Sequence, residues 1–269
     1  MGTHHFEEIK PFDISVKYTE LLPQNHIVDN DIHIHSECEV YINMSGDVSF
    51  VVEDSIYPVK YGDIIVTRPF EYHHCIHHSN KLHRHFWILF SCKGNEQLFG
   101  RFFDRAAGRD NLLTLCAHDT NELMELCHRM ADNTNCLKHL DFFKFIELLQ
   151  NASVSAPDTT YYPQDITYAI RYINLHFDES LSVADIAKDA GVSINTLERH
   201  FLKAVSLTPT EYIQSKRLAN AAKLLSLNYS VTDASQLSGF PDYSGFIALF
   251  KKHYGVTPLK YKKGVLQSD

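Results

Sequence analysis

One spacing pattern occurs twice in the C-terminal part of the chain. Two segments share a Phe, a Pro eight residues later and a Tyr three residues after that: Phe201, Pro209 and Tyr212, then Phe250, Pro258 and Tyr261. Upstream of each segment a small residue precedes a glycine by four positions, as Ala187 before Gly191 and Ser235 before Gly239. The small residue lets two helices approach, and the glycine permits a tight turn between them. The matched copies predict a duplicated helix-turn-helix unit.

Helix-start signals support this reading of residues 164–264 as an all-α domain. Ser182, Thr208 and Ser230 each stand three positions before an acidic residue, which is the spacing of a capping box. A proline follows Thr208 at the first helical position, where a missing N–H costs little. The stretch "TEYIQSKRLANAAKLLS" then predicts one long helix that joins the two helix-turn-helix units.

The N-terminal part has the punctuation of a β-rich domain. Short segments such as "EVYINM" and "HRHFWILF" are rich in Val, Ile, Phe and Tyr, and turn signals such as "SGD" and "KYGD" separate them. This pattern predicts a β-barrel or jelly roll in residues 1–110. Apolar residues at helical spacing predict a helical segment over 111–152, and "SVSAPDTTYYP" predicts a linker over 153–163. The expected fold class is therefore α+β with two domains.

Composition limits the classes of protein to consider. The net charge of the chain is −8, but the excess of acidic residues lies in residues 1–163. Five lysines cluster near the C-terminus: Lys251, Lys252, Lys260, Lys262 and Lys263. Such a cluster suits a surface that faces phosphates. No apolar run reaches the length of a membrane span. The polar start "MGTHHFEEIK" does not read as a signal peptide, and the six cysteines lack paired spacing. We expect a cytoplasmic protein with reduced thiols and no membrane partner.

The segment from Asp165 to Lys263 resembles the AraC family of bacterial transcription regulators. The stretches "KRLANAAKLL" and "GFPDYSGFIALFKKHYGVTPLKY" carry the resemblance, and the N-terminal part is similar to the family's cupin-like sensory domain. Ser206 and Ser235 depart from the family pattern, which usually has Gly and Ala there. The resemblance implies a homodimer that binds double-stranded DNA and a small-molecule effector, with a sugar favoured. RNA polymerase is a further expected partner of an activator, and repression is the alternative.

The resemblance also implies that two recognition helices enter successive major grooves. In "SINTLERHFLK", Leu197 and Phe201 face the core, and the opposite face carries the candidate DNA-binding residues Asn195, Thr196, Glu198, Arg199 and Lys203. Arg199 suits guanine and Asn195 suits adenine. The second helix presents Tyr243, Ser244, Ile247, Ala248, Lys251 and Lys252. Its lysines can bind phosphates, and Ile247 and Ala248 can contact thymine methyls, so we expect this helix to position the protein on DNA more than to read sequence. The alternative is an ordinary solvated helix surface.

Histidines in the N-terminal part suggest a metal or effector site. The motif "HIHSECE" places His33, His35 and Glu39 as in the first cupin metal motif, and His73 or His74 is similar to the second. Nitrogen and carboxylate ligands suit Zn²⁺, Ni²⁺, Fe²⁺ or Mn²⁺. The alternative is that these residues line an effector pocket without metal. Arg84 is a candidate for binding an anionic or polyol effector, and an exposed role is its alternative.

Two further hypotheses follow from the sequence. The stretch "KHLDFFKFIELL" has more apolar surface than a helix packed on a barrel needs, which predicts a homodimer through this region; complete burial within the chain is the alternative. For function, a cupin metal-dependent enzyme with an appended helical domain and a regulator without an effector are the competing readings. The duplicated unit favours a DNA-binding regulator that is not an enzyme.

Overall fold

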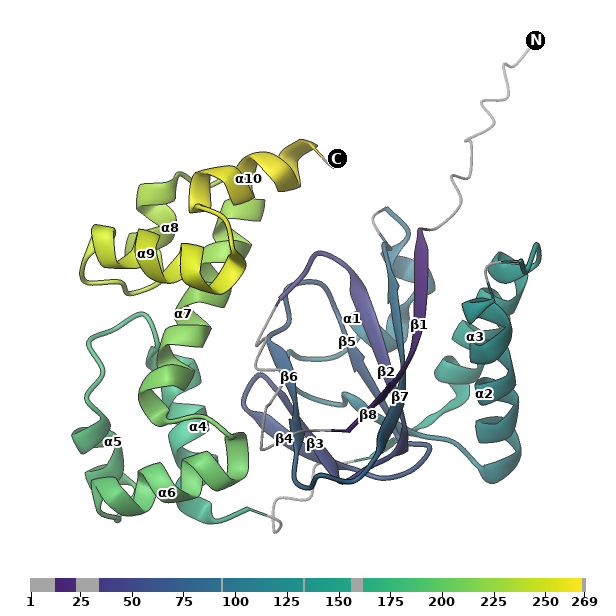
Figure 1. Cartoon of the computed structure of the whole chain (residues 1–269), viewed down its shortest axis with the longest axis horizontal. Coiled ribbons are helices and arrows are strands. Elements are labelled where there is room, and N and C mark those ends of the chain that lie inside the picture. The colour runs from purple at the N-terminus through teal and green to yellow at the C-terminus, as the bar shows by residue number, and fades with distance from the viewer. Residues whose placement is uncertain (1–12, 23–33, 93, 133, 156–161, 268–269) are drawn as a thin grey trace.

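The computed structural model describes residues 13–22, 34–92, 94–132, 134–155 and 162–267. The strands are β1 Ile14–Leu21, β2 Cys38–Ser45, β3 Val48–Val52, β4 Ser55–Val59, β5 Ile64–Thr67, β6 His73–His77, β7 His83–Phe90, β8 Leu112–Thr114 and β9 Ser153–Ser155. The helices are the short 3₁₀ turn η1 Glu96–Leu98, α1 Gly100–Phe103, α2 Ala117–Ala131, α3 Lys138–Asn151, α4 Gln164–His176, α5 Val183–Asp189, α6 Ile194–Val205, α7 Pro209–Ser226, α8 Val231–Leu237, α9 Tyr243–Tyr254 and α10 Pro258–Gln267. The chain therefore has a sheet-rich N-terminal domain and a helical C-terminal domain, as predicted (Figure 1).

The strands form two antiparallel sheets that face each other. The larger sheet has the order β1-β7-β2-β5-β8-β9, and the smaller has the order β4-β3-β6. Tyr41 of β2 lies opposite Trp87 of β7, and Phe50 of β3 lies opposite Cys75 of β6. These residues point into the space between the sheets, so the predicted β-barrel is confirmed.

Alternation along the strands divides the larger sheet into two faces. Phe86, Ile88 and Phe90 of β7 belong to a buried cluster with residues of α2 and α3. These two helices cover the outer face of the sheet (Figure 1). The odd-numbered residues of β7 therefore point into the barrel interior, so His83, His85 and Trp87 can line a cavity there.

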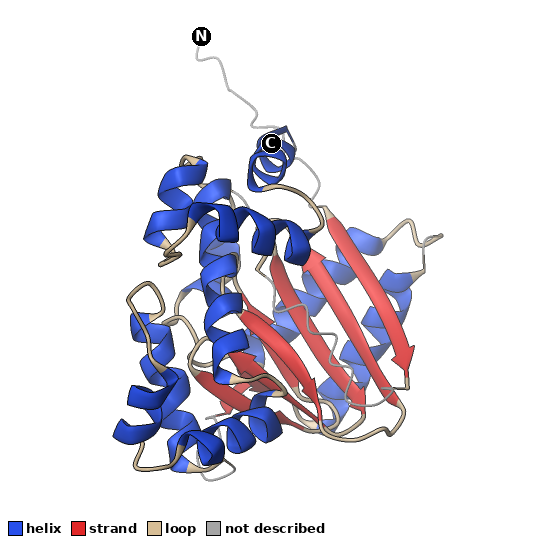
Figure 2. Cartoon of the chain, turned by 60° about the vertical axis from the view of Figure 1, so that its left-hand side comes forward, coloured by secondary structure: helices blue, strands red, loops and turns tan. Residues whose placement is uncertain are grey.

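The C-terminal domain contains the two expected helix-turn-helix units, α5–α6 and α8–α9, at the two ends of α7 (Figures 1 and 2). Leu197 and Phe201, which were predicted to face the core, have no exposed surface, and the same holds for Phe246 and Phe250 at the matching positions of the second unit. Gly191 and Gly239 adopt φ of +73° and +74°, the left-handed conformation that the tight turns require. Thr208 and Glu211 make a complete capping box at the start of α7.

Two boundaries differ from the sequence prediction. The three residues of β9 were assigned to the linker, but they pair with β8 at the edge of the larger sheet. The three residues of β8 were assigned to the helical segment, but they pair with β5. Strands of three residues are too short for alternation to reveal them in a sequence, and backbone pairing decides their structure. Residues 156–161 of the predicted linker lie outside the described part of the chain.

The two domains share a buried interface. Outward-facing residues of the smaller sheet, among them Val51, Ile56 and Ile76, join one apolar cluster with helices of the C-terminal domain. Lys216 of α7 reaches this interface, where its Nζ lies 2.7 Å from Oε2 of Glu53 and 4.0 Å above the ring of Tyr72. The C-terminal domain is thus packed directly on the sheet that closes the barrel. Among the described residues, no helix is long and apolar enough to cross a membrane.

Candidate functional site

The first recognition helix, α6, presents its predicted reading face to solvent. Asn195, Glu198, Arg199 and Lys203 are exposed. Thr196 is half-buried, and its hydroxyl oxygen lies 2.9 Å from that of Ser193. The helix starts with Ser193 as the N-cap, whose side chain accepts from the Thr196 N–H. The face opposite Leu197 and Phe201 therefore carries hydrogen-bonding groups that are free of the core.

Two residues near the end of α6 have additional contacts. Nδ1 of His200 lies 2.7 Å from Oδ2 of Asp165, which links α6 to α4. Lys203 lines a cavity of about 550 Å³ together with His77 and His78 of the barrel. The C-terminal end of α6 is therefore turned toward the sensory domain, while Asn195 and Arg199 lie nearer its start.

The second recognition helix, α9, differs in character, as its sequence indicated. Tyr243, Ser244, Lys251 and Lys252 are exposed, but Ile247 is half-buried against the core of the domain. Asp242 caps the helix and accepts from the backbone N–H groups of Ser244 and Gly245. The exposed ammonium groups near its end suit phosphates, which fix position without reading bases.

Inside the barrel, three of the predicted metal ligands meet. Nε2 of His35 lies 2.9 Å from Oε2 of Glu39, and Nε2 of His73 lies 3.3 Å from the same oxygen. Nδ1 of each histidine is bonded to a backbone carbonyl, that of Glu37 for His35 and that of Glu71 for His73. His33, the fourth predicted ligand, lies outside the described residues.

The cluster brings imidazole nitrogens and a carboxylate oxygen close enough together to share a cation. A carbonyl oxygen only accepts, so both Nδ1 atoms carry hydrogen. In neutral His35 and His73, both Nε2 atoms then direct lone pairs at a carboxylate oxygen of Glu39. A metal ion would relieve this convergence, and Nδ1–H bound to a carbonyl is the usual outer contact of a ligating histidine.

Two of the predicted effector or metal residues lie elsewhere. His74 follows His73 on β6 and therefore points to the opposite face, where its ring centroid is 6.4 Å from that of Tyr212. Arg84 lies on the face of β7 that carries Phe86, and its Nε is 3.2 Å from Oε2 of Glu20 on β1. Alternation places both residues outside the barrel interior, so His73 is the one of the two alternative histidines that joins the cluster, and Arg84 takes the exposed position that was its alternative.

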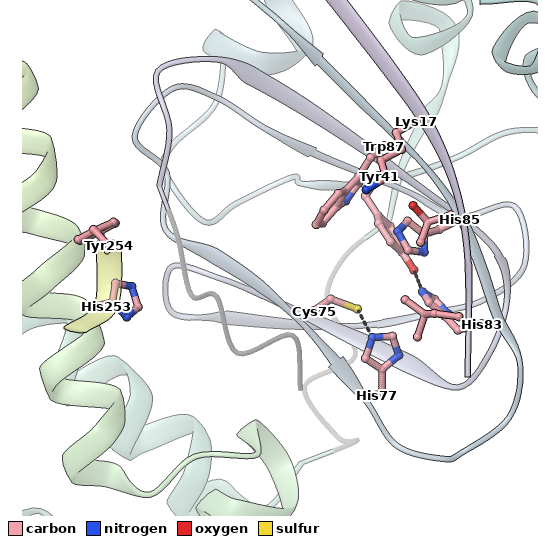
Figure 3. A pocket seen from close by; sticks show the side chains of 11 residues that line it. Lys17, Tyr41, Cys75, His77, His83, His85, Trp87, His253 and Tyr254 are labelled. Atoms are coloured by element: carbon pink, nitrogen blue, oxygen red, sulfur yellow. Dashed lines mark hydrogen bonds between the residues drawn. The ribbon is translucent and has the colours of Figure 1, made fainter. Parts of the chain in front are cut away.

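A cavity of about 490 Å³ opens between the barrel and α9 (Figure 3). Its lining comes from β1, β2, β6, β7 and α9, and includes Lys17, Tyr41, Cys75, His77, His83, His85, Trp87, His253 and Tyr254. Burial and the neighbouring His77 lower the pKa of His83 to about 4, and burial with the neighbouring His83 and His77 lowers the pKa of His85 to about 3. Both imidazoles are therefore neutral at pH 7, which leaves them able to accept hydrogen bonds or bind a metal.

Sequence reasoning missed this cavity. None of the residues that line it was among the candidate site residues predicted from the sequence. The signal that could have found the cavity is alternation: His83, His85 and Trp87 share one face of β7, as Cys75 and His77 share one face of β6. What the sequence does not contain is the pairing that brings these two strands to face each other.

Comparison with known proteins identifies the family. Residues 21–136 match the model of an AraC-like ligand binding domain, and residues 186–264 match that of a helix-turn-helix domain. The probable transcription factor PqrA of Proteus vulgaris is 32% identical over 96 residues, which are 35% of this chain and 79% of that protein. The chain belongs to the AraC family of transcription regulators.

Other relatives differ in how much of their length they share with it. The xylose operon regulatory protein of Escherichia coli K12 is 32% identical over 139 residues, 51% of this chain and 35% of that protein. The chain spans about a third of the length of the first curated relatives that it matches. Among solved structures, ToxT of Vibrio cholerae O395 aligns over 95% of this chain and 100% of its own, with 16% identity and a TM-score of 0.39.

Proposed function

We propose that this AraC-family chain binds specific DNA sequences through α6 and α9 and that a small molecule in its barrel controls this binding. The observation that carries the proposal is the pair of helix-turn-helix units at the two ends of α7. A helix of 18 residues is about 27 Å long, which is comparable with the roughly 34 Å of one turn of DNA. Two recognition helices so spaced can reach successive major grooves on one side of the duplex.

The two helices have different roles in this proposal. The side chains of Asn195 and Arg199 can bond to base edges, since Arg suits guanine and Asn suits adenine. Lys251 and Lys252 on α9 hold phosphates and fix the register. Transcription activation through contact with RNA polymerase is the mode of action that we propose, and activity as an enzyme is not part of it.

The effector that we propose is a small polar molecule, with a sugar favoured. The cavity beside α9 combines neutral imidazoles, a phenol and the indole of Trp87, and sugars bind to such mixtures of hydrogen-bonding groups and ring faces. The similarity to a regulator of a xylose operon supports the same class. His253 and Tyr254 of α9 also line the cavity, so an occupant there would touch both domains.

A divalent metal ion at His35, Glu39 and His73 is a second part of the proposal. The arrangement that supports it is the convergence of two imidazole nitrogens on one carboxylate oxygen. These three residues would hold Zn²⁺, Ni²⁺, Fe²⁺ or Mn²⁺, and the ion would order the end of the barrel where β2 and β6 begin.

DNA binding is tested with the full chain. Selection from random duplexes should return a preferred sequence, and affinity for it should fall steeply as salt rises because phosphate contacts release counterions. Adding candidate sugars, xylose first, should change that affinity. A folded protein that shows no salt-sensitive binding to any duplex would contradict the regulator function.

A further inference from the structure

Strand β6, at the edge of the smaller sheet, carries potential metal ligands beyond those already described. Residues at alternate positions of β6 point into the barrel, so Cys75 and His77 face the same way as His73. Sγ of Cys75 lies 4.0 Å from Nε2 of His77. Across the barrel, His83 of β7 completes a group whose ligand atoms all lie within 4.8 Å of one another.

The histidine from the larger sheet is oriented as a metal ligand would be. Nδ1 of His83 lies 2.8 Å from the carbonyl oxygen of Ser45, and this bond places the proton on Nδ1. Nε2 then carries the lone pair, and the hydroxyl of Tyr41, 3.0 Å away, donates to it (Figure 3). A carbonyl that fixes the tautomer from behind is the usual outer support of a ligating imidazole.

The hydroxyl of Tyr41 can give way to an ion without losing all its partners. Burial raises the pKa of Tyr41 well above its usual value, so the hydroxyl keeps its proton and acts as a donor. A second acceptor, Oδ1 of Asn43, already lies 3.4 Å from it. The phenol can therefore turn from His83 to Asn43 when Nε2 binds a metal.

We propose that Cys75, His77 and His83 form a site for Zn²⁺, distinct from the cluster of His35, Glu39 and His73. One thiolate and two imidazole nitrogens are a donor set that Zn²⁺ prefers over Mg²⁺ or Mn²⁺. With Zn–N of about 2.0–2.1 Å and Zn–S of about 2.3 Å, tetrahedral ligands lie roughly 3.3–3.5 Å apart. The three side chains therefore need to close by about 1 Å to bind the ion.

Binding requires little change in protonation. His83 is neutral at pH 7, and on binding Cys75 loses its thiol proton to solvent and becomes the thiolate ligand. The fourth position faces the cavity, where water or a donor atom of an effector can occupy it. His85 lies beside this position, since its ring centroid is 4.7 Å from that of His83 and its buried Nδ1 has no hydrogen-bond partner among the described residues.

Cobalt substitution distinguishes this site from the other cluster. Co²⁺ bound to a thiolate gives a sulfur-to-metal charge-transfer band, which the His35, Glu39 and His73 set cannot produce. Metal-free protein titrated with Co²⁺ should show this band at one equivalent, and Zn²⁺ should remove it by displacement. Cys75→Ser should abolish the band, and His77→Gln should weaken Zn²⁺ binding at least about tenfold.

Two variants serve as controls. His35→Ala removes a ligand of the other cluster and should leave the band intact. Cys116→Ser removes an exposed thiol next to His118, Asp119 and Glu122, a surface group that could bind a metal adventitiously, and it should also leave the band intact. Absence of the band in the parent protein, its persistence in Cys75→Ser or its loss in Cys116→Ser would each overturn the proposal. DNA binding by the metal-free protein tests the regulator function separately.

Discussion

Single residues on the two recognition helices should differ in what they contribute to DNA binding. Arg199 is exposed on the reading face of α6, whereas Lys251 lies near the end of α9. Arg199→Ala should cost about 1–3 kcal/mol of binding free energy and relax the preference at one base pair. Lys251→Ala should weaken binding to all duplexes alike and reduce its salt dependence. Equal losses of affinity for all sequences in both variants would show that α6 is not the reading helix. Arg171→Ala, on α4, is the matched control.

Ser206 adopts a left-handed backbone conformation that glycine would adopt with less strain. It ends α6 with φ of +59°, in the left-handed region that side chains with a Cβ rarely adopt. Ser206→Gly should therefore raise the free energy of unfolding by about 0.5–1 kcal/mol, measured by urea denaturation. Asn228 has φ of +69°, but asparagine tolerates this region, so Asn228→Gly should gain less. An equal gain at both positions would show that relief of strain at Ser206 is not the cause.

At the scale of elements, the two helix-turn-helix turns look alike in sequence but have different surroundings. A Cβ on Gly239 would lie 2.5 Å from the backbone oxygen of Asp178, whereas a Cβ on Gly191 would meet nothing within 4 Å. Gly191→Ala should cost about 1 kcal/mol of stability for its positive φ alone. Gly239→Ala should cost about 3 kcal/mol or more, because a backbone clash is added. Similar losses in thermal or urea unfolding would contradict this difference.

The same contrast shows how much of the structure could be predicted from the sequence. Spacing revealed the two units, their buried Leu and Phe residues, and α7 with its capping box, because each depends on local geometry. The metal-type cluster at Glu39 was found because His35 lies four residues away on the same chain segment. The group of Cys75, His77 and His83 was not predicted, because β6 and β7 belong to different sheets and only the packing of these sheets brings the three residues together. Likewise, β9 exists only because β8 provides a pairing edge.

At the scale of the whole molecule, α3 leaves an apolar surface uncovered. Its buried side, with Phe142, Phe145 and Leu149, fills the core beneath the larger sheet. Leu137, Leu140 and Phe143 remain 57%, 51% and 46% exposed. The alternative of complete burial is therefore wrong for this stripe, and a second copy of the chain is the partner that we still predict for it.

The dimer is tested by placing a charge on that surface. Leu140→Glu should convert a dimer into a monomer in light scattering at micromolar concentration, because an ionised carboxylate is costly to bury in an apolar interface. Leu175 on α4 is 65% exposed, so Leu175→Glu is the matched control and should remain dimeric. A parent protein that is already monomeric under these conditions would refute the prediction.

The contact between the domains includes an ion pair between Glu53 and Lys216. Glu53 bonds to Lys216 through its carboxylate, and its carbonyl oxygen accepts from Asn174 and lies 3.3 Å from the hydroxyl of Tyr212. Burial lowers the pKa of Lys216, which shows that the interior disfavours its charge, and Glu53 offsets part of that cost.

Removing only one charge of this pair should therefore be worse than removing both. Glu53→Gln leaves the ammonium of Lys216 buried without a counter-charge, which should cost about 1–3 kcal/mol after allowance for the partial exposure of Glu53. Backbone amides of β3, β6 and α7 should then exchange hydrogen faster, because the domains separate more often. The double variant Glu53→Gln with Lys216→Met buries no charge and should recover most of the protection. If the single and double variants exchange at the same rate, the ion pair does not hold the smaller sheet against α7. A signal from the barrel would then have to reach the recognition helices through the apolar contacts of Val51, Ile56 and Ile76.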